Sequence, residues 1–339
     1  MLKFIIISLI IAAFVLSILI KCSNYPSVKH SRLSKKLWVE QSKSEEDYQK
    51  QIRKERINKV IKYIVVYLFL TIVAFFVVFP FYYMFAASLM TQDEVLGYPP
   101  TLIPKSLQFI NFRIAMSQPG VNFGKYMVNT LIVGVFSTIG TLVTTVLSAY
   151  AFARLNFKGK DLMFTIFIAT MMIPGEVLVI TNYITVCHVE RLGWYDTYQA
   201  MIIPFWVSTY YIFLLRNNFK QIPNELYYAA KVDGTSDFKY LLKVMIPIAS
   251  PTIITITILK LMGAWNSYIW PNLVVDAAKD EKTLITVGLR KGFAVEEGGR
   301  PVTHLQMAAT TVVTVPLLLV FVLFRKYIVK GVSRSGIKG

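Results

Sequence analysis

The chain has 339 residues, of which 55% are hydrophobic and 16% are charged, and its formal net charge is +17. A soluble domain would carry about 25% charged residues, so this composition excludes an ordinary soluble protein. The basic residues lie between and beside long apolar runs. That distribution is typical of membrane topology and argues against nucleic-acid binding.

Seven apolar stretches approach the roughly 20 residues that a helix needs to cross the hydrocarbon layer. We expect spans at 4–20, 62–87, 125–153, 161–182, 197–216, 248–270 and 304–324. The first stretch could instead be a signal peptide. Lys21 stands where a lipoprotein site needs a small residue, and cleavage would deliver the basic 21–62 segment to the outside. We therefore favour an uncleaved extra span.

Loops rich in Lys and Arg alternate along the chain with loops that carry few basic residues or an equal number of acidic ones. They are frequent in 21–62, 154–160, 217–246 and the tail after 324, whereas in 271–303 five bases are offset by five acids. The positive-inside rule makes the basic segments cytoplasmic, including the C-terminus. The prediction is an all-α, polytopic helical membrane protein with six spans in 62–339. The N-terminal part at 1–61 holds an extra span and a basic cytoplasmic segment.

The interval between the spans at 197–216 and 248–270 predicts a short helix. Pro223 suits a first helical turn, and Glu225 places negative charge near its positive end. Leu226, Ala229 and Ala230 fall on one narrow stripe, and Asp233-Gly234 supplies a left-handed stop.

Such a helix, at about 224–234, is marginal in water and persists only if something packs against it. Docking on the protein's own span ends and docking on a partner both remain open at this point. Thr235 or Ser236 can cap a following helix, with Phe238, Leu241, Leu242 and Met245 on one face.

Four ordered segments resemble one known family. The run "IPNELYYAAKVDGTSDFKYLLKVMIPIASP" is similar to the cytoplasmic coupling loop of ATP-binding-cassette importer permeases. The runs "NTLIVGVFSTIGTLVTTVLSAYAFARLNFKGK" with "TMMIP", then "GAWNSYIWP", and finally the tail "RKYIVKGVSRSGIKG" resemble the carbohydrate-uptake branch, of maltose type. The resemblance covers about 62–339, and it implies that this part is a six-span permease core in the bacterial cell membrane.

The resemblance implies a carbohydrate-import permease that works with a second permease subunit, an ABC ATPase dimer and an extracellular solute-binding protein, expected as a lipoprotein. It implies that the 224–234 helix couples to the ATPase and that the tail 325–339 reaches toward the same partner. Tyr228 departs from the family pattern, because the motif has glutamate at that position. The coupling residues expected are Glu225, Leu226, Tyr228, Ala229, Ala230, Asp233 and Gly234, and those of the tail are Gly336, Lys338 and Gly339.

Cofactor binding by this chain is not expected. Gly124-Lys125 and Gly159-Lys160 lack the rest of a phosphate-binding loop, so ATP and Mg belong to a separate ATPase. Cysteine and histidine show no metal-ligand spacing, and the clustered polar residues of a membrane enzyme are missing. We predict a transport subunit without catalytic residues, in contact with membrane lipid. The alternative is a stand-alone secondary transporter or channel for a small polar solute.

Several residues within spans are candidates for a translocation pathway. Pro174-Gly175, Pro204 and Pro316 predict interrupted helices, which are tolerated beside protein or a wet cavity. Glu176 and Lys260 are ionisable at or near membrane depth. Aromatic faces, from Tyr211 and Tyr268 among others, with Ser208 and Ser267 nearby, suit sugar rings, although interfacial anchoring is the commoner role of such rings. The candidates are Glu176, Trp206, Tyr210, Lys260, Trp265 and Asn266.

Overall fold

The computed structural model describes residues 45–118, 121–188, 190–276, 278–293 and 302–333, which form helices and loops without a strand. The chain divides into two units, Met1–Met84 and Phe85–Gly339. The described residues of the first unit belong to α3 (Glu45–Ser88), whose stretch from Arg53 onward is long and apolar enough to cross a membrane. The predicted division at residue 61 falls inside this continuous helix, where its composition changes from charged to apolar. The predicted span 4–20 lies outside the described residues.

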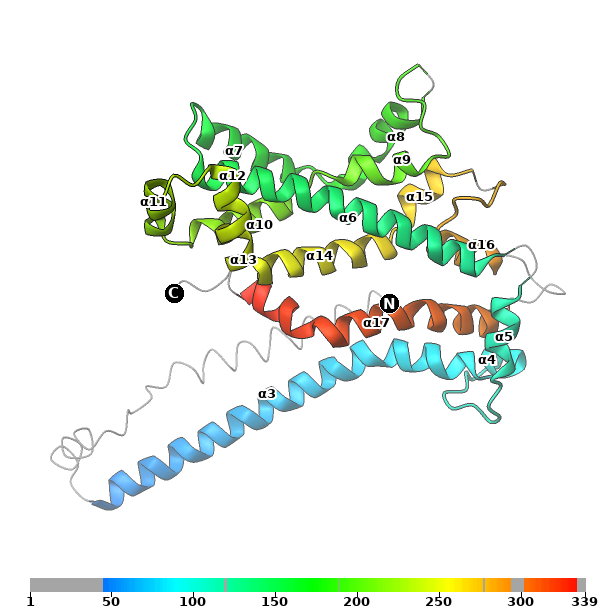
Figure 1. Ribbon diagram of the computed structural model, residues 1–339. Coiled ribbons are helices and arrows are strands. Elements are labelled where there is room, and N and C mark those ends of the chain that lie inside the picture. The colour runs from blue at the N-terminus through cyan, green and yellow to red at the C-terminus, as the bar shows by residue number, and fades with distance from the viewer. Residues whose placement is uncertain (1–44, 119–120, 189, 277, 294–301, 334–339) are drawn as a thin grey trace. The chain divides into compact units, whose positions relative to one another are not determined.

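The second unit is a bundle of long helices joined by short ones (Figure 1). Its elements are α4 (Gln92–Leu96), α5 (Ile110–Met116), α6 (Phe123–Arg154), α7 (Lys160–Ala169), η1 (Thr170–Met172), η2 (Gly175–Leu178), α8 (Val179–Cys187), α9 (Tyr198–Ile202), η3 (Ile203–Phe205), α10 (Thr209–Lys220), α11 (Asn224–Val232), α12 (Asp237–Tyr240), η4 (Leu241–Met245), α13 (Ile246–Ile248), α14 (Ser250–Trp265), α15 (Ile269–Val274), α16 (Ile285–Gly292) and α17 (Thr303–Ser333).

Helix α6 is the central element of this unit and packs against α9, α10, α14 and α16. It begins where the Asn122 side chain accepts a hydrogen bond from the Lys125 amide, and it ends at Arg154. Its buried face is rich in small and hydroxyl-bearing side chains, among them Ser137, Thr141 and Thr145. Small residues let membrane helices approach closely, because lipid supplies no hydrophobic drive for their association.

Five of the six predicted core spans lie in this unit, and three of them are bent. Helices α6 and α17 are each long enough to cross a membrane alone. The other candidates are pairs: Lys160–Met172 with Gly175–Cys187, bent by 87°; Tyr198–Phe205 with Thr209–Lys220, bent by 40°; and Asp237–Ile248 with Ser250–Trp265, bent by 79°. With α3, up to six spans result, as predicted.

The prolines account for part of this bending. Pro174 lies in the break after η1, and Pro204 lies in η3 just before the 40° bend. Proline removes a backbone hydrogen-bond donor and so interrupts the helical hydrogen bonds at both places. Pro316, by contrast, lies inside α17, which continues through it. The predicted span 248–270 corresponds to α14, which ends at Trp265, and α15 follows as a separate short helix.

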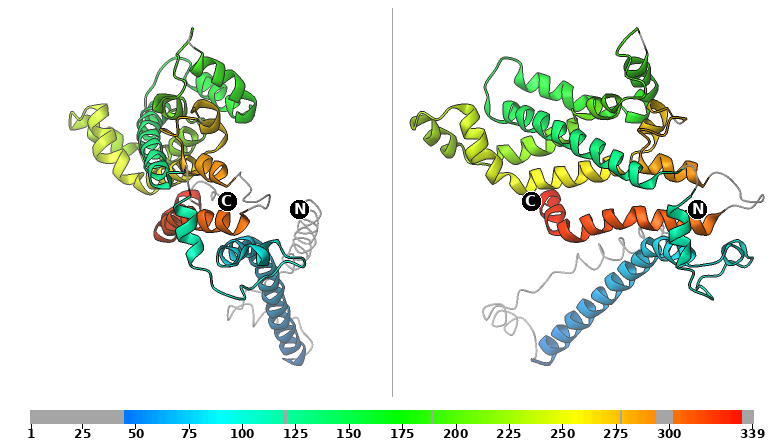
Figure 2. Two further views of the ribbon diagram at one scale, coloured as in Figure 1. Left: turned by 90° about the vertical axis from the view of Figure 1, so that its right-hand side faces the viewer. Right: turned by 45° about the vertical axis from the view of Figure 1, so that its right-hand side comes forward.

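The two ends of α6 carry different structures. Helices α11 and α12 lie at its C-terminal end and α16 lies at its N-terminal end, as Figures 1 and 2 show. Beside α11 a buried apolar cluster joins Ala149 and Tyr150 of α6 to residues of α10 and η4 such as Phe219 and Met245. Tyr227 and Ala230 of α11 pack against this cluster.

Candidate functional site

Helix α11 is the short helix expected between the spans. Pro223 occupies the N-cap position, one residue before the first turn and without a side-chain cap, and Glu225 is the acidic residue of that turn. At the other end Gly234 has φ of +70°, and the amides of Gly234 and Thr235 donate to the carbonyls of Lys231 and Ala230. This is the predicted left-handed stop, where glycine carries no Cβ penalty.

The inner face of α11 is held by one carboxylate. Asp237 Oδ1 accepts hydrogen bonds from the Tyr150 and Tyr227 hydroxyls, each at 3.0 Å, and lies 3.0 Å from Lys231 Nζ. The interaction with Asp237 raises the pKa of Lys231, and burial with Asp237 raises the pKa of Tyr227. Lys231 therefore stays cationic and Tyr227 stays neutral. Asp237 ties α11 to α6 and α12.

A second tie comes from the last residue of α6. The guanidinium of Arg154 donates to the Phe219 carbonyl at 3.0 Å, to the Ile222 carbonyl and to the Asn224 side chain. The planar fork of arginine suits several acceptors at once. Through Arg154 the start of α11 is fixed to the ends of α6 and α10. Neither Arg154 nor Asp237 was among the sequence candidates.

The opposite face of α11 is exposed. Tyr228 is 63% exposed, Val232 is 88% exposed and Leu226 is 43% exposed, and Glu225 and Ala229 are exposed with them. The expected stripe of Leu226, Ala229 and Ala230 is therefore divided, because Ala230 packs with Tyr227 on the inner apolar cluster. Asp233 and Gly234 lie exposed at the end of the helix. We call Glu225, Leu226, Tyr228, Ala229 and Val232 the outer face of α11.

The predicted second helix of this interval is confirmed at its cap and corrected on its face. The Ser236 hydroxyl accepts a hydrogen bond from the Lys239 amide at 3.4 Å. Leu241 and Met245 are buried, whereas Phe238 and Leu242 are 62% and 48% exposed. The chain continues from α12 into a π-helical turn, η4, which changes the residues that share one face. Two apolar side chains are thereby exposed near α11.

A cavity of about 330 Å³ lies around Lys260. Its wall includes Ser137 of α6, Phe205 of η3, Ser208 and Tyr211 at the start of α10, Ser267, and Trp270 of α15. Lys260 Nζ donates to the Phe205 carbonyl at 2.9 Å, a carbonyl at the break before α10. Broken helices free such groups. Phe205 and Trp270, which meet edge to face at 5.7 Å, were not predicted, because their meeting depends on the bend.

The other pathway candidates are not in this cavity's wall. Glu176 is exposed in η2, Tyr210 packs against Tyr211 at 5.4 Å, and Asn266 caps α14 by donating to the Met262 carbonyl. Trp265 donates to the Val313 carbonyl at 3.2 Å and so joins α14 to α17. Trp206 lies against Gly140 of α6, where a Cβ would come within 2.1 Å of the indole nitrogen. Glycine is required there for close approach.

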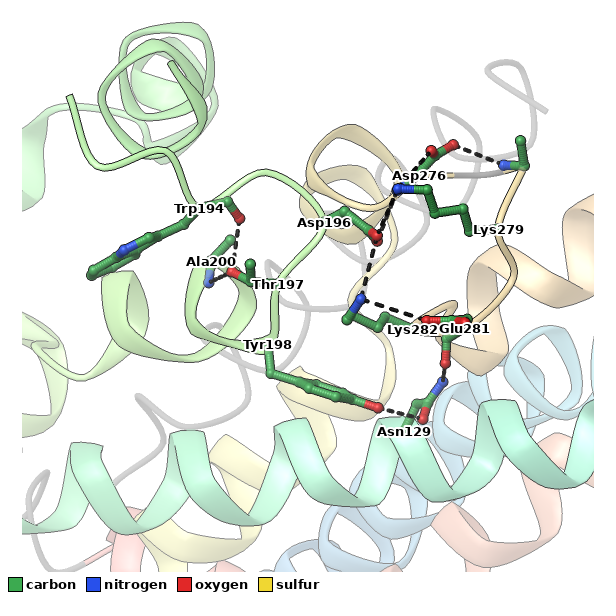
Figure 3. A network of polar contacts seen from close by, with 11 residues as sticks. Asn129, Trp194, Asp196, Thr197, Tyr198, Ala200, Asp276, Lys279, Glu281 and Lys282 are labelled. Atoms are coloured by element: carbon green, nitrogen blue, oxygen red, sulfur yellow. Dashed lines mark hydrogen bonds and ion pairs between the residues drawn. The ribbon is translucent and has the colours of Figure 1, made fainter. Parts of the chain in front are cut away.

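A polar network joins two loops near the N-terminal half of α6 (Figure 3). Asp196, nearly buried, accepts from the Asp276 amide at 3.3 Å and pairs with Lys282 at 3.3 Å and Lys279 at 3.8 Å. Asn129 of α6 donates to the carbonyls of Glu281 and Thr283 and accepts from the Tyr198 hydroxyl at 2.8 Å. The loop before α9 and the loop after α15 are thus held together.

Two further expectations concern the C-terminal tail and metal binding. Gly336, Lys338 and Gly339 of the tail are outside the described residues. Among the described residues, no group of three or more His, Cys, Asp or Glu side chains could hold a metal ion.

Comparisons with known proteins match most of the chain. A family model for "Binding-protein-dependent transport system inner membrane component" matches residues 143–334. The sn-glycerol-3-phosphate transport system permease protein UgpE of Brucella abortus (strain 2308) is 28% identical over 289 residues, which are 84% of this chain and 99% of that protein. The trehalose/maltose transport system permease protein MalG of Thermococcus litoralis is 29% identical over 284 residues, 83% of this chain and 99% of that protein.

The fold is also similar to a solved structure. The crystal structure of a bacterial ABC transporter involved in the import of the acidic polysaccharide alginate contains a chain that matches with a TM-score of 0.68 and 25% identity. The match covers 81% of this chain and 98% of that chain. The similarity therefore extends beyond the region of the family model.

Proposed function

Because the chain belongs to the family of binding-protein-dependent transport system inner membrane components, we propose that it is a permease subunit of an ATP-driven importer for a carbohydrate or a related sugar. The relatives support this substrate class, because they serve sn-glycerol-3-phosphate and trehalose or maltose, and the similar structure imports alginate. These substrates include both charged and neutral molecules. The protein is a multi-pass membrane protein, and it acts as a transport subunit rather than as an enzyme.

The importer has three kinds of partner. A second permease subunit completes the pathway, an extracellular solute-binding protein delivers the substrate, and an ABC ATPase dimer binds ATP and Mg. The family description itself names dependence on a binding protein. The basic segments and the C-terminus face the cytoplasm, so α11 faces the ATPase and the tail extends toward the same partner.

One observation carries the proposal: the outer face of α11 is exposed although the helix is firmly held from behind. Leu226, Ala229 and Val232 present adjacent apolar side chains to water, and an exposed apolar patch of this kind is typical of a protein interaction site. Asp237 and Arg154 fasten the same helix to α6, α10 and α12. A displacement of α11 is therefore transmitted to the spans rather than absorbed by a loop.

The coupling is a rigid-body change between two states. When the ATPase closes over ATP it moves the helix seated on it, and the chain from α12 through η4 and α13 leads directly into α14. ATP and substrate then bias one equilibrium from opposite sides of the membrane.

Tyr228 stands where the family motif has glutamate, and it belongs to the outer face of α11. Contact there is consequently made by a ring and hydroxyl rather than by a carboxylate.

The test is copurification followed by transport. The chain, expressed with its neighbouring transport proteins, should copurify with an ATPase and a second permease, and uptake of the sugar that the binding protein retains should stop when the ATPase loses its ATP site. Uptake that continues without the ATPase, driven by an ion gradient, would establish the stand-alone transporter instead.

A further inference from the structure

Two neighbouring cavities in the second unit have the same chemical character. The first is the cavity around Lys260. The second, of about 480 Å³, is lined by Tyr268, Thr286, Leu289, Arg290, Gln306 and Thr310. They meet at consecutive residues, since Ser267 lines the first and Tyr268 lines the second. The Thr286 hydroxyl in the second donates to the Ser267 carbonyl at 2.5 Å.

Each cavity holds one cation beside an aromatic ring. Lys260 Nζ lies 5.6 Å from the centre of the Phe205 ring, and Arg290 Cζ lies 5.3 Å from the centre of the Tyr268 ring. The described residues that line the two cavities include no Asp or Glu, and neither cation forms an ion pair with a described residue. The described lining of each cavity therefore carries a net positive charge.

Among the described residues, the Lys260 ammonium has fewer hydrogen-bond acceptors than it has donors. It has three donors, and the Phe205 carbonyl accepts one of them. A cation within a span is costly and is normally turned toward a partner or a wet cavity. Arg290 lies in α16, outside the candidate spans, and is exposed at the second cavity. A third cavity, at the start of α6, differs because its lining includes both Lys125 and Asp280.

We propose that the two cavities bind a carbohydrate that carries negative charge, as a carboxylate or a phosphate, with Arg290 and Lys260 as successive partners of the anionic group. The rings of Tyr268, Phe205 and Trp270 take the apolar faces of the sugar, and Ser208, Ser267 and Thr310 supply hydroxyls. This assignment rests on the proposed function and specifies its substrate class.

The experiment measures the charge preference of the cavity without requiring knowledge of the sugar. In the assembled importer, with Cys22→Ser and Cys187→Ala as background, Ser267→Cys is labelled with two methanethiosulfonate reagents, one ending in sulfonate and one in trimethylammonium. The labelling rate of each reagent is measured in two states of the importer, without nucleotide and with ATP and vanadate. Met116→Cys, in the third cavity, is the matched control.

The expected result is a sulfonate-to-trimethylammonium rate ratio at Ser267→Cys about tenfold above that at Met116→Cys, because a unit charge in a partly screened cavity acts with this strength. Lys260→Met should lower the ratio at Ser267→Cys about tenfold, Arg290→Gln should lower it less, and Lys260→Arg should preserve it. The ratio at Met116→Cys should not change with any of them.

Three results would overturn the proposal. The ratio at Ser267→Cys could equal that of the control, it could be unaffected by Lys260→Met, or the cysteine could react with neither reagent in either state. The last result would make Lys260 a buried cap of the Phe205 carbonyl. Labelling does not depend on transport, so a charge-selective cavity in a complex without ATP-dependent uptake would refute the proposed function and leave the charge preference standing.

Discussion

Single residues decide which side of α11 is available to a partner. Helical spacing places Leu226, Ala229 and Ala230 on one stripe, and this much can be read from the sequence. The structure divides the stripe because Asp237 draws Tyr227 and Lys231 toward Tyr150, and Ala230 turns inward with them. Tyr150 and Asp237 are 87 residues apart, and no local pattern predicts that contact.

Ala229 is the residue at which contact with a partner is most simply blocked. Ala229→Trp should reduce ATP-dependent uptake at least about tenfold, since one overpacked contact costs about 1–3 kcal/mol at a close interface. The amount of protein in the membrane should remain unchanged, because the side chain is exposed. The control is Ala229→Ser, which should retain uptake. Uptake unaffected by the tryptophan would show that nothing packs closely here.

At the scale of whole elements, breaks in the spans were predictable but their consequences were not. Pro174-Gly175 and Pro204 indicate interruptions from sequence, whereas the bends of 87° and 40° depend on how the flanking helices pack. Pro316 shows the limit of the rule, because α17 passes through it. The bend after η3 forms the cavity around Lys260 by directing the Phe205 carbonyl and ring toward α14.

The packing of η3 on α6 gives a stability prediction. Gly140→Ala should lower the free energy of unfolding by about 1–3 kcal/mol, because its Cβ would meet the Trp206 indole. Thermal unfolding of the purified protein in lipid nanodiscs measures the loss. In a Trp206→Ala background the same substitution should cost much less, since the obstructing ring is then absent. An equal cost of Gly140→Ala in both backgrounds would contradict the observed contact.

The polar network around Asp196 gives a second prediction about stability. Asp196→Asn should destabilise the protein by about 1–3 kcal/mol, because a nearly buried carboxylate loses its ion pairs with two lysines. Asparagine tolerates the left-handed backbone at this position, where φ is 55°, so the change isolates the charge. The matched control is Asp276→Asn. It should lower the free energy of unfolding by only about 0–1 kcal/mol, because the ion pair between Asp276 and Lys279 is more exposed. An equal cost at both positions would refute the central role of Asp196.

For the whole molecule, the broad assignment was accessible from the sequence. Apolar runs and alternating basic loops predict a helical protein of several spans, and four ordered motifs resemble the family that the comparisons show. The cavities were not accessible, because they combine side chains from α6, η3, α14, α15, α16 and α17. Lys260 was found because charge within an apolar run is conspicuous, whereas Arg290 lies among ordinary loop charges.

The account depends on α11 being seated on an ATPase in the cytoplasm, and site-directed crosslinking tests this most directly. In the assembled importer, with Cys22→Ser and Cys187→Ala as background, a thiol-to-amine crosslinker attached at Ala229→Cys should join this chain to the ATPase subunit. The same reagent at Ala230→Cys, on the inner face, should give little product. Failure of Ala229→Cys to reach the ATPase, or its labelling by an impermeant reagent added outside intact cells, would contradict the account.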